Sequence, residues 1–317
     1  MRILITGGLG FIGHEVACCL EQEHQVTVVD SLTDYGFIPS KELTALFDER
    51  KSRLNCQLKI ADIRNKYYFD RLLEITKPDV VVHLASFPRQ KVVLENPHTA
   101  SEVMSTGLIN LLEASKGKIS KFVYISSSMV YGDFNDMVSE TQECNPRGQY
   151  AIMKYMGEKL VADYKKYFDY TIIRPSAVYG ARDVEDRVLS KFMMNSLRGE
   201  TVTVKGANEI LDFTYVTDTA QGIAKAATQS CNYDIYNITR CQDTPITLEL
   251  AAKTVIDLVG KGKLTITDRD LNFPSRGRLS IEHARNDLGY DPKIDFEKGC
   301  LLYLDWIKNS EYWNEQI

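Results

Sequence analysis

The sequence predicts an α/β fold: a doubly wound parallel sheet with a smaller, interleaved C-terminal α/β lobe. Three observations support this prediction. Short apolar runs alternate with helical patterns over residues 1–175, a glycine-rich turn joins the first run to the first helical pattern, and an aspartate ends the second run. Repeated strand–helix–strand units favour parallel strands with right-handed crossovers.

The first part of the chain alternates predicted strands and helices. Residues 80–84 form an almost unbroken apolar run, which is typical of a strand covered by helices on both faces. The predicted strands are residues 3–6, 26–30, 57–60, 80–84, 122–126 and 171–174, and the predicted helices are residues 11–23, 66–76, 100–115 and 150–167.

The pattern is less regular after residue 180, where proline and glycine turns separate the elements. We expect a first domain of residues 1–175, completed by segments from about 211–240, and an interleaved second lobe formed mainly by residues 176–317. In this part the predicted helices are residues 187–198, 217–230, 248–258, 281–288 and 296–308, and the predicted strands are residues 201–204, 211–216 and 234–238.

Composition excludes several classes of protein. The 317 residues carry a net charge of −5, whereas a nucleic-acid-binding protein would show a basic surplus. No apolar run is long enough to span a bilayer, so we expect no membrane association. The seven cysteines are scattered without a CxxC pair, which favours reduced thiols, no metal site and a cytoplasmic protein.

The glycine turn indicates a dinucleotide site. Gly7, Gly10 and Gly13 follow a predicted strand and open a predicted helix. A dinucleotide diphosphate needs bare backbone at such a turn and is attracted by the free N–H groups of the helix. Asp30 ends the next strand, where a carboxylate can accept both ribose hydroxyls and would repel a 2′-phosphate. The sequence therefore predicts an NAD-binding Rossmann domain at residues 1–175.

A tyrosine and a lysine form a candidate catalytic pair. Tyr150 and Lys154 lie four residues apart in a predicted helix, so both side chains are on one face. A tyrosine must lower its pKa by about three units to act as a base near neutral pH. A neighbouring ammonium and a positively charged nicotinamide ring can both stabilise the phenolate.

The Gly-x-x-Gly-x-x-Gly spacing and the Tyr-x-x-x-Lys pair resemble the extended short-chain dehydrogenase/reductase family, in its group of NAD-dependent nucleotide-sugar epimerases and dehydratases. The resemblance covers nearly the whole chain. It implies a catalytic trio of Ser127, Tyr150 and Lys154, with the serine hydroxyl on the sugar oxygen that is oxidised. It also implies a homodimer through the predicted helices 100–115 and 150–167.

The resemblance further implies which residues contact NAD and a nucleotide-diphosphate sugar. The implied NAD contacts are Gly7, Gly10, Phe11, Ile12, Gly13, Asp30, Ser31, Asp62, Ile63, Leu84, Ala85, Ser86, Tyr150, Lys154 and Pro175. The implied substrate contacts are Lys91, Ser127, Ser128, Ala177, Arg187, Val204 and Arg278.

Two positions depart from the family pattern at the substrate end. Ala177 stands where the family usually has an asparagine, and Leu211 where it usually has a phosphate-binding arginine. We expect Arg278 to bind the diphosphate instead, with Arg276 and Arg182 as weaker candidates. Leu279 is aligned with the position that limits sugar size in the 4-epimerases.

The residues after Ser127 bear on the reaction. The family's 4,6-dehydratases have an Asp-Glu pair there and its decarboxylases a glutamate at the second position, whereas this chain has Ser128 and Met129. A 4-epimerase needs no such acid and is the expected activity. A net nucleotide-sugar dehydrogenase or 4-ketoreductase is the alternative. Elimination and decarboxylation are less expected, and a non-catalytic NAD sensor is a remote possibility.

Overall fold

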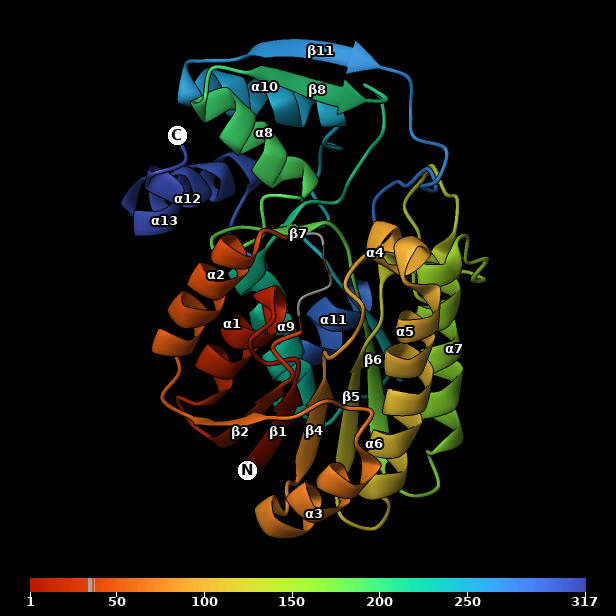
Figure 1. The fold of residues 1–317 in the computed structure, drawn as a ribbon. Coiled ribbons are helices and arrows are strands. Elements are labelled where there is room, and N and C mark those ends of the chain that lie inside the picture. Colours follow the sequence, from red (N-terminus) through yellow and green to blue (C-terminus); the bar gives the residue numbers. More distant parts are fainter. Residues whose placement is uncertain (34–35, 37) are drawn as a thin grey trace.

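The computed structural model describes residues 1–33, 36 and 38–317. Seven parallel strands form the main sheet in the order β10-β6-β5-β4-β1-β2-β3 (Figure 1). The strands are β1 (Arg2–Thr6), β2 (Gln25–Asp30), β3 (Gln57–Ile60), β4 (Val80–His83), β5 (Lys121–Ile125), β6 (Asp169–Pro175) and β10 (Ile235–Ile238). The predicted doubly wound α/β fold is confirmed.

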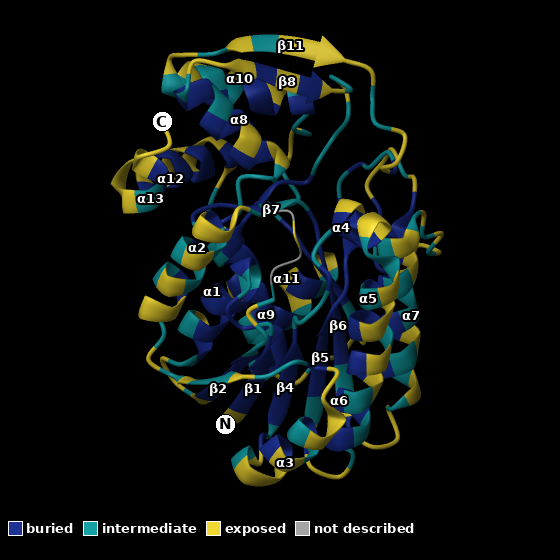
Figure 2. Cartoon of the chain, in the orientation of Figure 1, coloured by how far each residue is buried: buried dark blue, intermediate teal, exposed yellow. Residues whose placement is uncertain are grey.

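Helices cover both faces of this sheet, which is why its central strands are apolar throughout. One face packs on α1 (Phe11–Leu20), α9 (Val216–Thr228) and α11 (Glu282–Leu288). The other packs on α3 (Lys66–Thr76), α6 (Leu108–Ser115) and α7 (Gln149–Asp163). Figure 2 shows the strands as buried and the outer faces of the helices as exposed.

The second lobe lies beyond the carboxyl ends of the main strands (Figure 1). Its two-stranded parallel sheet pairs β8 (Thr201–Lys205) with β11 (Lys263–Thr267). A separate apolar core joins this lobe to the top of the sheet domain. The helices of this lobe are α8 (Val188–Leu197), α10 (Leu248–Val259), α12 (Phe296–Asn309) and α13 (Glu311–Asn314), and α2 (Ser40–Ser52) of the sheet domain packs against the same core through Leu46.

Several predicted elements differ from the structure. The predicted strand 211–216 shrinks to β9 (Thr214–Tyr215), which pairs with β7 (Val178–Tyr179) outside the main sheet. The predicted helix 100–115 is divided into α5 (Pro97–Ser101), a π-helical segment (Glu102–Gly107) and α6. Helix α2, helix α4 (Gln90–Glu95) and strand β11 were not predicted.

One glycine lets α7 approach the sheet closely. A Cβ on Gly157 would lie 2.1 Å from the hydroxyl oxygen of Tyr124 on β5. The helix that carries Tyr150 and Lys154 is therefore held directly against the strand that ends before Ser127.

Within the described residues, no helix is long and apolar enough to cross a membrane.

Candidate active site

A cavity of about 970 Å³ opens where the sheet domain meets the second lobe. Its lining comes from the segments that follow β1, β2, β4, β5 and β6, together with residues of α2, α8 and β8. β1 and β4 lie side by side in the sheet although the chain proceeds in opposite directions from them, and ligands of such sheets bind at this switch point.

Bare backbone forms the floor of the cavity at the glycine turn. Gly7 has a φ of +70°, and a Cβ there would lie 2.6 Å from the backbone nitrogen of Ala85. A Cβ on Gly13 would lie 2.1 Å from the carbonyl oxygen of Gly7. Helix α1 begins at Phe11 with no side chain capping its first N–H groups. The turn can therefore accept a diphosphate closely, with open N–H groups behind it.

Asp30 lies beside this turn at the end of β2. Its carboxylate accepts hydrogen bonds from the backbone nitrogens of Leu9 and Leu32, each at 2.9 Å. Burial raises the pKa of Asp30, and these N–H groups and the nearby Arg50 oppose that rise. A carboxylate oxygen has more than one lone pair, so Asp30 can still accept a ribose hydroxyl.

Arg50 was not predicted as a site residue. It is buried, lines the cavity, and donates to the carbonyl oxygens of Leu9 at 3.0 Å and Arg182 at 2.5 Å. Burial lowers its pKa to about 10, against the charges of Asp183 and Asp30. Arg50 thus connects the glycine turn to the loop before α8. It lies on α2, which the sequence does not predict as a helix, and no motif marks it as a site residue.

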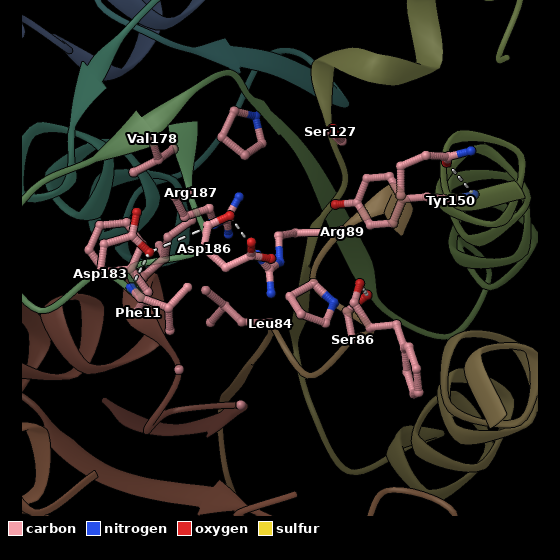
Figure 3. A pocket seen from close by; sticks show the side chains of 18 of the residues that line it. Phe11, Leu84, Ser86, Arg89, Ser127, Tyr150, Val178, Asp183, Asp186 and Arg187 are labelled. Carbon is pink, nitrogen blue, oxygen red and sulfur yellow. Dashed lines mark hydrogen bonds and ion pairs between the residues drawn. The ribbon is translucent and has the colours of Figure 1, made fainter. Parts of the chain in front are cut away.

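The three candidate catalytic residues line the other end of the cavity. Tyr150 begins the first turn of α7, and its backbone nitrogen donates to Gln90 Oε1 at 3.1 Å. Lys154 Nζ donates to the carbonyl oxygen of Ile125 at 2.8 Å and lies 5.9 Å from the centre of the Tyr150 ring. Ser127 caps the 3₁₀ turn Ser128–Tyr131 and accepts from the nitrogen of Met129 at 3.2 Å. Figure 3 shows Ser127 and Tyr150 at the cavity wall.

Burial dominates the electrostatics of this trio. Burial lowers the pKa of Lys154 to about 7, and the Glu158 carboxylate opposes this fall. Burial raises the pKa of Tyr150, and Arg187 and a hydrogen bond with Ser127 oppose this rise without cancelling it. Burial thus moves the pKa of the phenol up and that of the amine down, because it disfavours the charged form of each group.

Charged side chains surround the middle of the cavity. Arg89 Nη1 lies 2.7 Å from Asp186 Oδ2, which joins the loop after β4 to the loop before α8. Lys191 also pairs with Asp186, at 2.5 Å. Asp183 is buried in the same wall, and its Oδ1 lies 3.7 Å from Arg187 Nε. Figure 3 shows Arg89, Asp186 and Arg187 between Tyr150 and Asp183.

Most residues implied by the resemblance line this one cavity. The lining includes all fifteen implied NAD contacts: Gly7, Gly10, Phe11, Ile12, Gly13, Asp30, Ser31, Asp62, Ile63, Leu84, Ala85, Ser86, Tyr150, Lys154 and Pro175. It also includes the implied substrate contacts Lys91, Ser127, Ser128, Ala177 and Arg187. Their roles stay predictions.

Two implied substrate contacts lie elsewhere. Arg278 does not line the cavity, because its guanidinium donates to the carbonyl oxygens of Gln242 at 3.0 Å and Asp243 at 2.9 Å. Arg276, the weaker candidate, lines the cavity in its place. Val204 is fully buried, because alternate side chains of β8 face the core. The lining from this strand is Thr203 and Lys205.

The other expectations at the substrate end give a mixed result. Leu211 lines the cavity where the family has an arginine, but Leu279 is buried against Tyr131 and Val138, away from the lining. Arg182 pairs with Glu49 at 2.9 Å instead of lining the cavity. In the described residues no group of three or more His, Cys, Asp or Glu side chains could hold a metal ion.

Ala177 has a strained backbone. Its φ of +35° lies in the left-handed region that alanine rarely adopts. Asparagine tolerates this region better than other non-glycine residues. The asparagine usual in the family would therefore relieve backbone strain here as well as offer an amide to the cavity.

Comparisons with known proteins agree along almost the whole chain. The family model described as "NAD dependent epimerase/dehydratase family" matches residues 3–239. A Methanocaldococcus jannaschii protein, provisionally named a UDP-glucose 4-epimerase, is 31% identical over 97% of this chain and 99% of its own length.

Two solved structures are similar in both sequence and fold. The UDP-glucose 4-epimerase of Thermotoga maritima, solved with UDP-glucose, is 25% identical with a TM-score of 0.86, over 97% of this chain and 99% of its own. The UDP-glucuronic acid 4-epimerase of Bacillus cereus, solved with UDP-glucuronic acid and NAD, is 27% identical with a TM-score of 0.88, over the same shares of the two chains.

Proposed function

The chain belongs to the NAD dependent epimerase/dehydratase family, a family of enzymes, and we propose that it is an NAD-dependent nucleotide-sugar 4-epimerase. One observation carries this proposal within the family. Ser127, Tyr150 and Lys154 line the cavity together, and the residues that follow Ser127 are Ser128 and Met129. This combination supports reversible oxidation of a sugar hydroxyl, because elimination would need an acid or base beside the serine.

The cavity fits NAD on its own geometry. Gly7, Gly10 and Gly13 supply the close backbone approach, and the uncapped start of α1 supplies N–H donors for the diphosphate. Asp30 would hold the adenosine ribose, and Asp62 with Ile63 would contact adenine. When bound, NAD takes a hydride from the sugar and returns it.

The chain's own residues move the proton. Tyr150, as the phenolate, would accept the proton of the sugar C4 hydroxyl at its hydroxyl oxygen and give it back in the reverse step. The Lys154 ammonium would stabilise that phenolate from one helical turn away. The Ser127 hydroxyl would hydrogen-bond the same sugar oxygen and hold it toward Tyr150. Epimerisation would then require the oxidised sugar to rotate in the cavity before the hydride returns.

The substrate class follows from the relatives and the charges. The two solved relatives hold UDP-glucose and UDP-glucuronic acid. Arg187 and Arg276 are positive groups of the lining that could face a diphosphate. We therefore propose a nucleoside-diphosphate sugar as the substrate.

The unpaired state of all seven cysteines agrees with a reducing, cytoplasmic location, which cell fractionation would test.

Turnover of defined sugars tests the activity. Purified protein is incubated with UDP-glucose, UDP-glucuronic acid and their N-acetylated relatives, and the products are separated by chromatography. We expect the C4 epimer without net formation of reduced cofactor. Stoichiometric formation of reduced cofactor without an epimer would instead establish the dehydrogenase alternative.

Replacement of Tyr150 tests the catalytic assignment. Tyr150→Phe removes the proton acceptor, so we expect turnover to fall about 10²–10⁴-fold while bound NAD is retained. Tyr155→Phe is the matched control, because Tyr155 lies on the same helix but does not line the cavity. Equal activity of the two variants would rule out Tyr150 as the base.

A further inference from the structure

A fully buried ion pair lies directly behind the catalytic residues. Glu158 of α7 and Arg174 of β6 each have side chains only 3% exposed. Arg174 Nε donates to Glu158 Oε1 at 2.9 Å, and Arg174 Nη2 donates to Oε2 at 2.6 Å. Burial of two charges is costly unless their hydrogen bonds are satisfied, so a pair at this place invites a functional explanation.

Glu158 also binds the end of the catalytic strand. Ser126 donates its hydroxyl to Glu158 Oε1 at 2.5 Å. Lys154, one helical turn before Glu158, donates to the carbonyl oxygen of Ile125. Two side chains on one face of α7 therefore hold the last residue of β5 and the residue that follows it, and Ser127 is the next residue along. The spacing between Ser127 and the Tyr150–Lys154 pair depends on these two contacts.

We propose that Glu158 is a positioning residue: its carboxylate, bound to Ser126 and Arg174, fixes the end of β5 against α7 and places a negative charge one helical turn from Lys154. This inference rests on the proposed function, in which Lys154 stabilises the Tyr150 phenolate. Glu158 does not line the cavity, so it acts through Lys154 and Ser127 and not on the substrate.

The surroundings of Lys154 support this role for the charge. The Tyr124 ring of β5 and the Tyr150 ring of α7 lie 5.3 Å and 5.9 Å from its Nζ. His83 of β4 has its pKa lowered to about 3 by burial and by Lys154, so it stays neutral and adds no charge. The positive charge of Arg187, on the loop before α8, lowers the pKa of Tyr150 against the effect of burial.

Glu158 supplies the opposing charge to Lys154. Burial lowers the pKa of Lys154 to about 7, and the Glu158 carboxylate raises it against that larger effect. Arg174 of β6 donates to both oxygens of this carboxylate. The ion pair is thus arranged with its negative end on the helix that carries the catalytic lysine.

The decisive variant removes the charge and keeps the shape. In Glu158→Gln we expect the alkaline limb of the kcat–pH profile to move down by about one pH unit or more, because Lys154 loses its proton earlier. Ser126→Ala is the matched control: it removes one hydrogen bond to Glu158 but leaves the charge. We expect its alkaline limb at the wild-type pH, with turnover reduced no more than about tenfold.

A second readout does not depend on turnover. Ultraviolet titration of tyrosinate, taken as the difference between each protein and its Tyr150→Phe counterpart, reports the ionisation of Tyr150. We expect this ionisation to move to higher pH in Glu158→Gln, because the phenolate loses its neighbouring cation. A merely structural role of Glu158 would lower the melting temperature and leave both titrations in place.

Folding failure is handled by a double variant. If Glu158→Gln leaves Arg174 buried without a partner and unfolds the protein, Glu158→Gln/Arg174→Met removes both charges, and the same shifts are expected. Wild-type titrations in a folded variant would overturn the inference. If Tyr150→Phe is inactive and these titrations do not move, only the role of Glu158 fails; if Tyr150→Phe is fully active, the proposed function fails.

Discussion

Arg276 and Arg278 lie two residues apart but have opposite surroundings. Arg276 lines the cavity, and burial lowers its pKa to about 10 while Glu209 opposes that fall. Arg278 is held by two backbone carbonyls outside the cavity. We therefore propose that Arg276, and not the Arg278 expected from the sequence, compensates for Leu211.

This assignment predicts different effects of two matched variants. Arg276→Ala should raise the KM for UDP-glucose or UDP-glucuronic acid about 10–100-fold, since a hydrogen bond to a charged group contributes about 1.5–3 kcal/mol. Arg278→Ala should change KM less than about threefold. Steady-state kinetics of both variants decide the matter, and a larger KM effect at Arg278 would reverse the assignment.

Much of the site could be predicted because its residues stand in motifs with fixed spacing. The glycine turn, Asp30 and the Tyr150–Lys154 pair follow or begin regular elements, so their positions along the chain determine their positions in space. The segment around Arg276 has no periodicity, so the sequence does not determine whether position 276 or position 278 reaches the cavity. Arg50 reaches the cavity from α2 across the turn, which no local pattern reveals.

At the scale of elements, prediction succeeded where the helical or the strand pattern of apolar residues was regular. Helix α3 and strand β3 begin and end at the predicted residues. Strand β11 was missed because it is short and largely exposed, and it is held in place by pairing with β8 and by Leu264, which packs against the core of the second lobe. β9 is short because Asp212, two residues before it, accepts hydrogen bonds from Thr239, Cys241 and Leu279 that fix an irregular loop.

Helix α2 carries a buried carboxyl that predicts pH-dependent stability. Glu42 accepts a hydrogen bond from the nitrogen of Glu185 at 2.8 Å, and burial raises its pKa to about 7, with Glu185 and Asp183 adding repulsion. Because the folded pKa lies above the ordinary value of 4.5, ionisation of Glu42 costs stability, which is lost as the pH rises from 4.5 through 7.

Glu42→Gln should remove this cost while keeping an acceptor for Glu185. We expect the variant to be about 1–3 kcal/mol more stable than the wild type at pH 8 and about equal to it at pH 4.5. Urea denaturation at the two pH values measures this difference. A variant less stable at pH 8 would show that the Glu42 carboxylate is stabilising in its ionised form.

For the whole molecule, the cavity depends on the chain leaving the sheet and returning to it. The second lobe contributes α8 and β8 before the chain comes back as α9 and β10 to complete the sheet beside β6. Arg50 from α2 and Arg89 from the loop after β4 then bind the loop that leads into α8. Cofactor and sugar ends of the cavity are therefore built from both parts, which suits an enzyme that must hold two ligands at once.

Association of two chains is the remaining prediction at this scale. The family resemblance implies pairing through α6 and α7, and Ile109 of α6 is 38% exposed in the single chain. A glutamate placed at such an interface would have to lose its hydration without a partner. We therefore expect wild-type protein to sediment as a dimer at micromolar concentration and Ile109→Glu as a monomer.

Leu250→Glu, at a similarly exposed apolar position on α10 (41%), should remain a dimer, because α10 lies in the second lobe away from α6 and α7. Sedimentation of the wild type as a monomer would refute the interface, and dissociation by both variants would place it elsewhere.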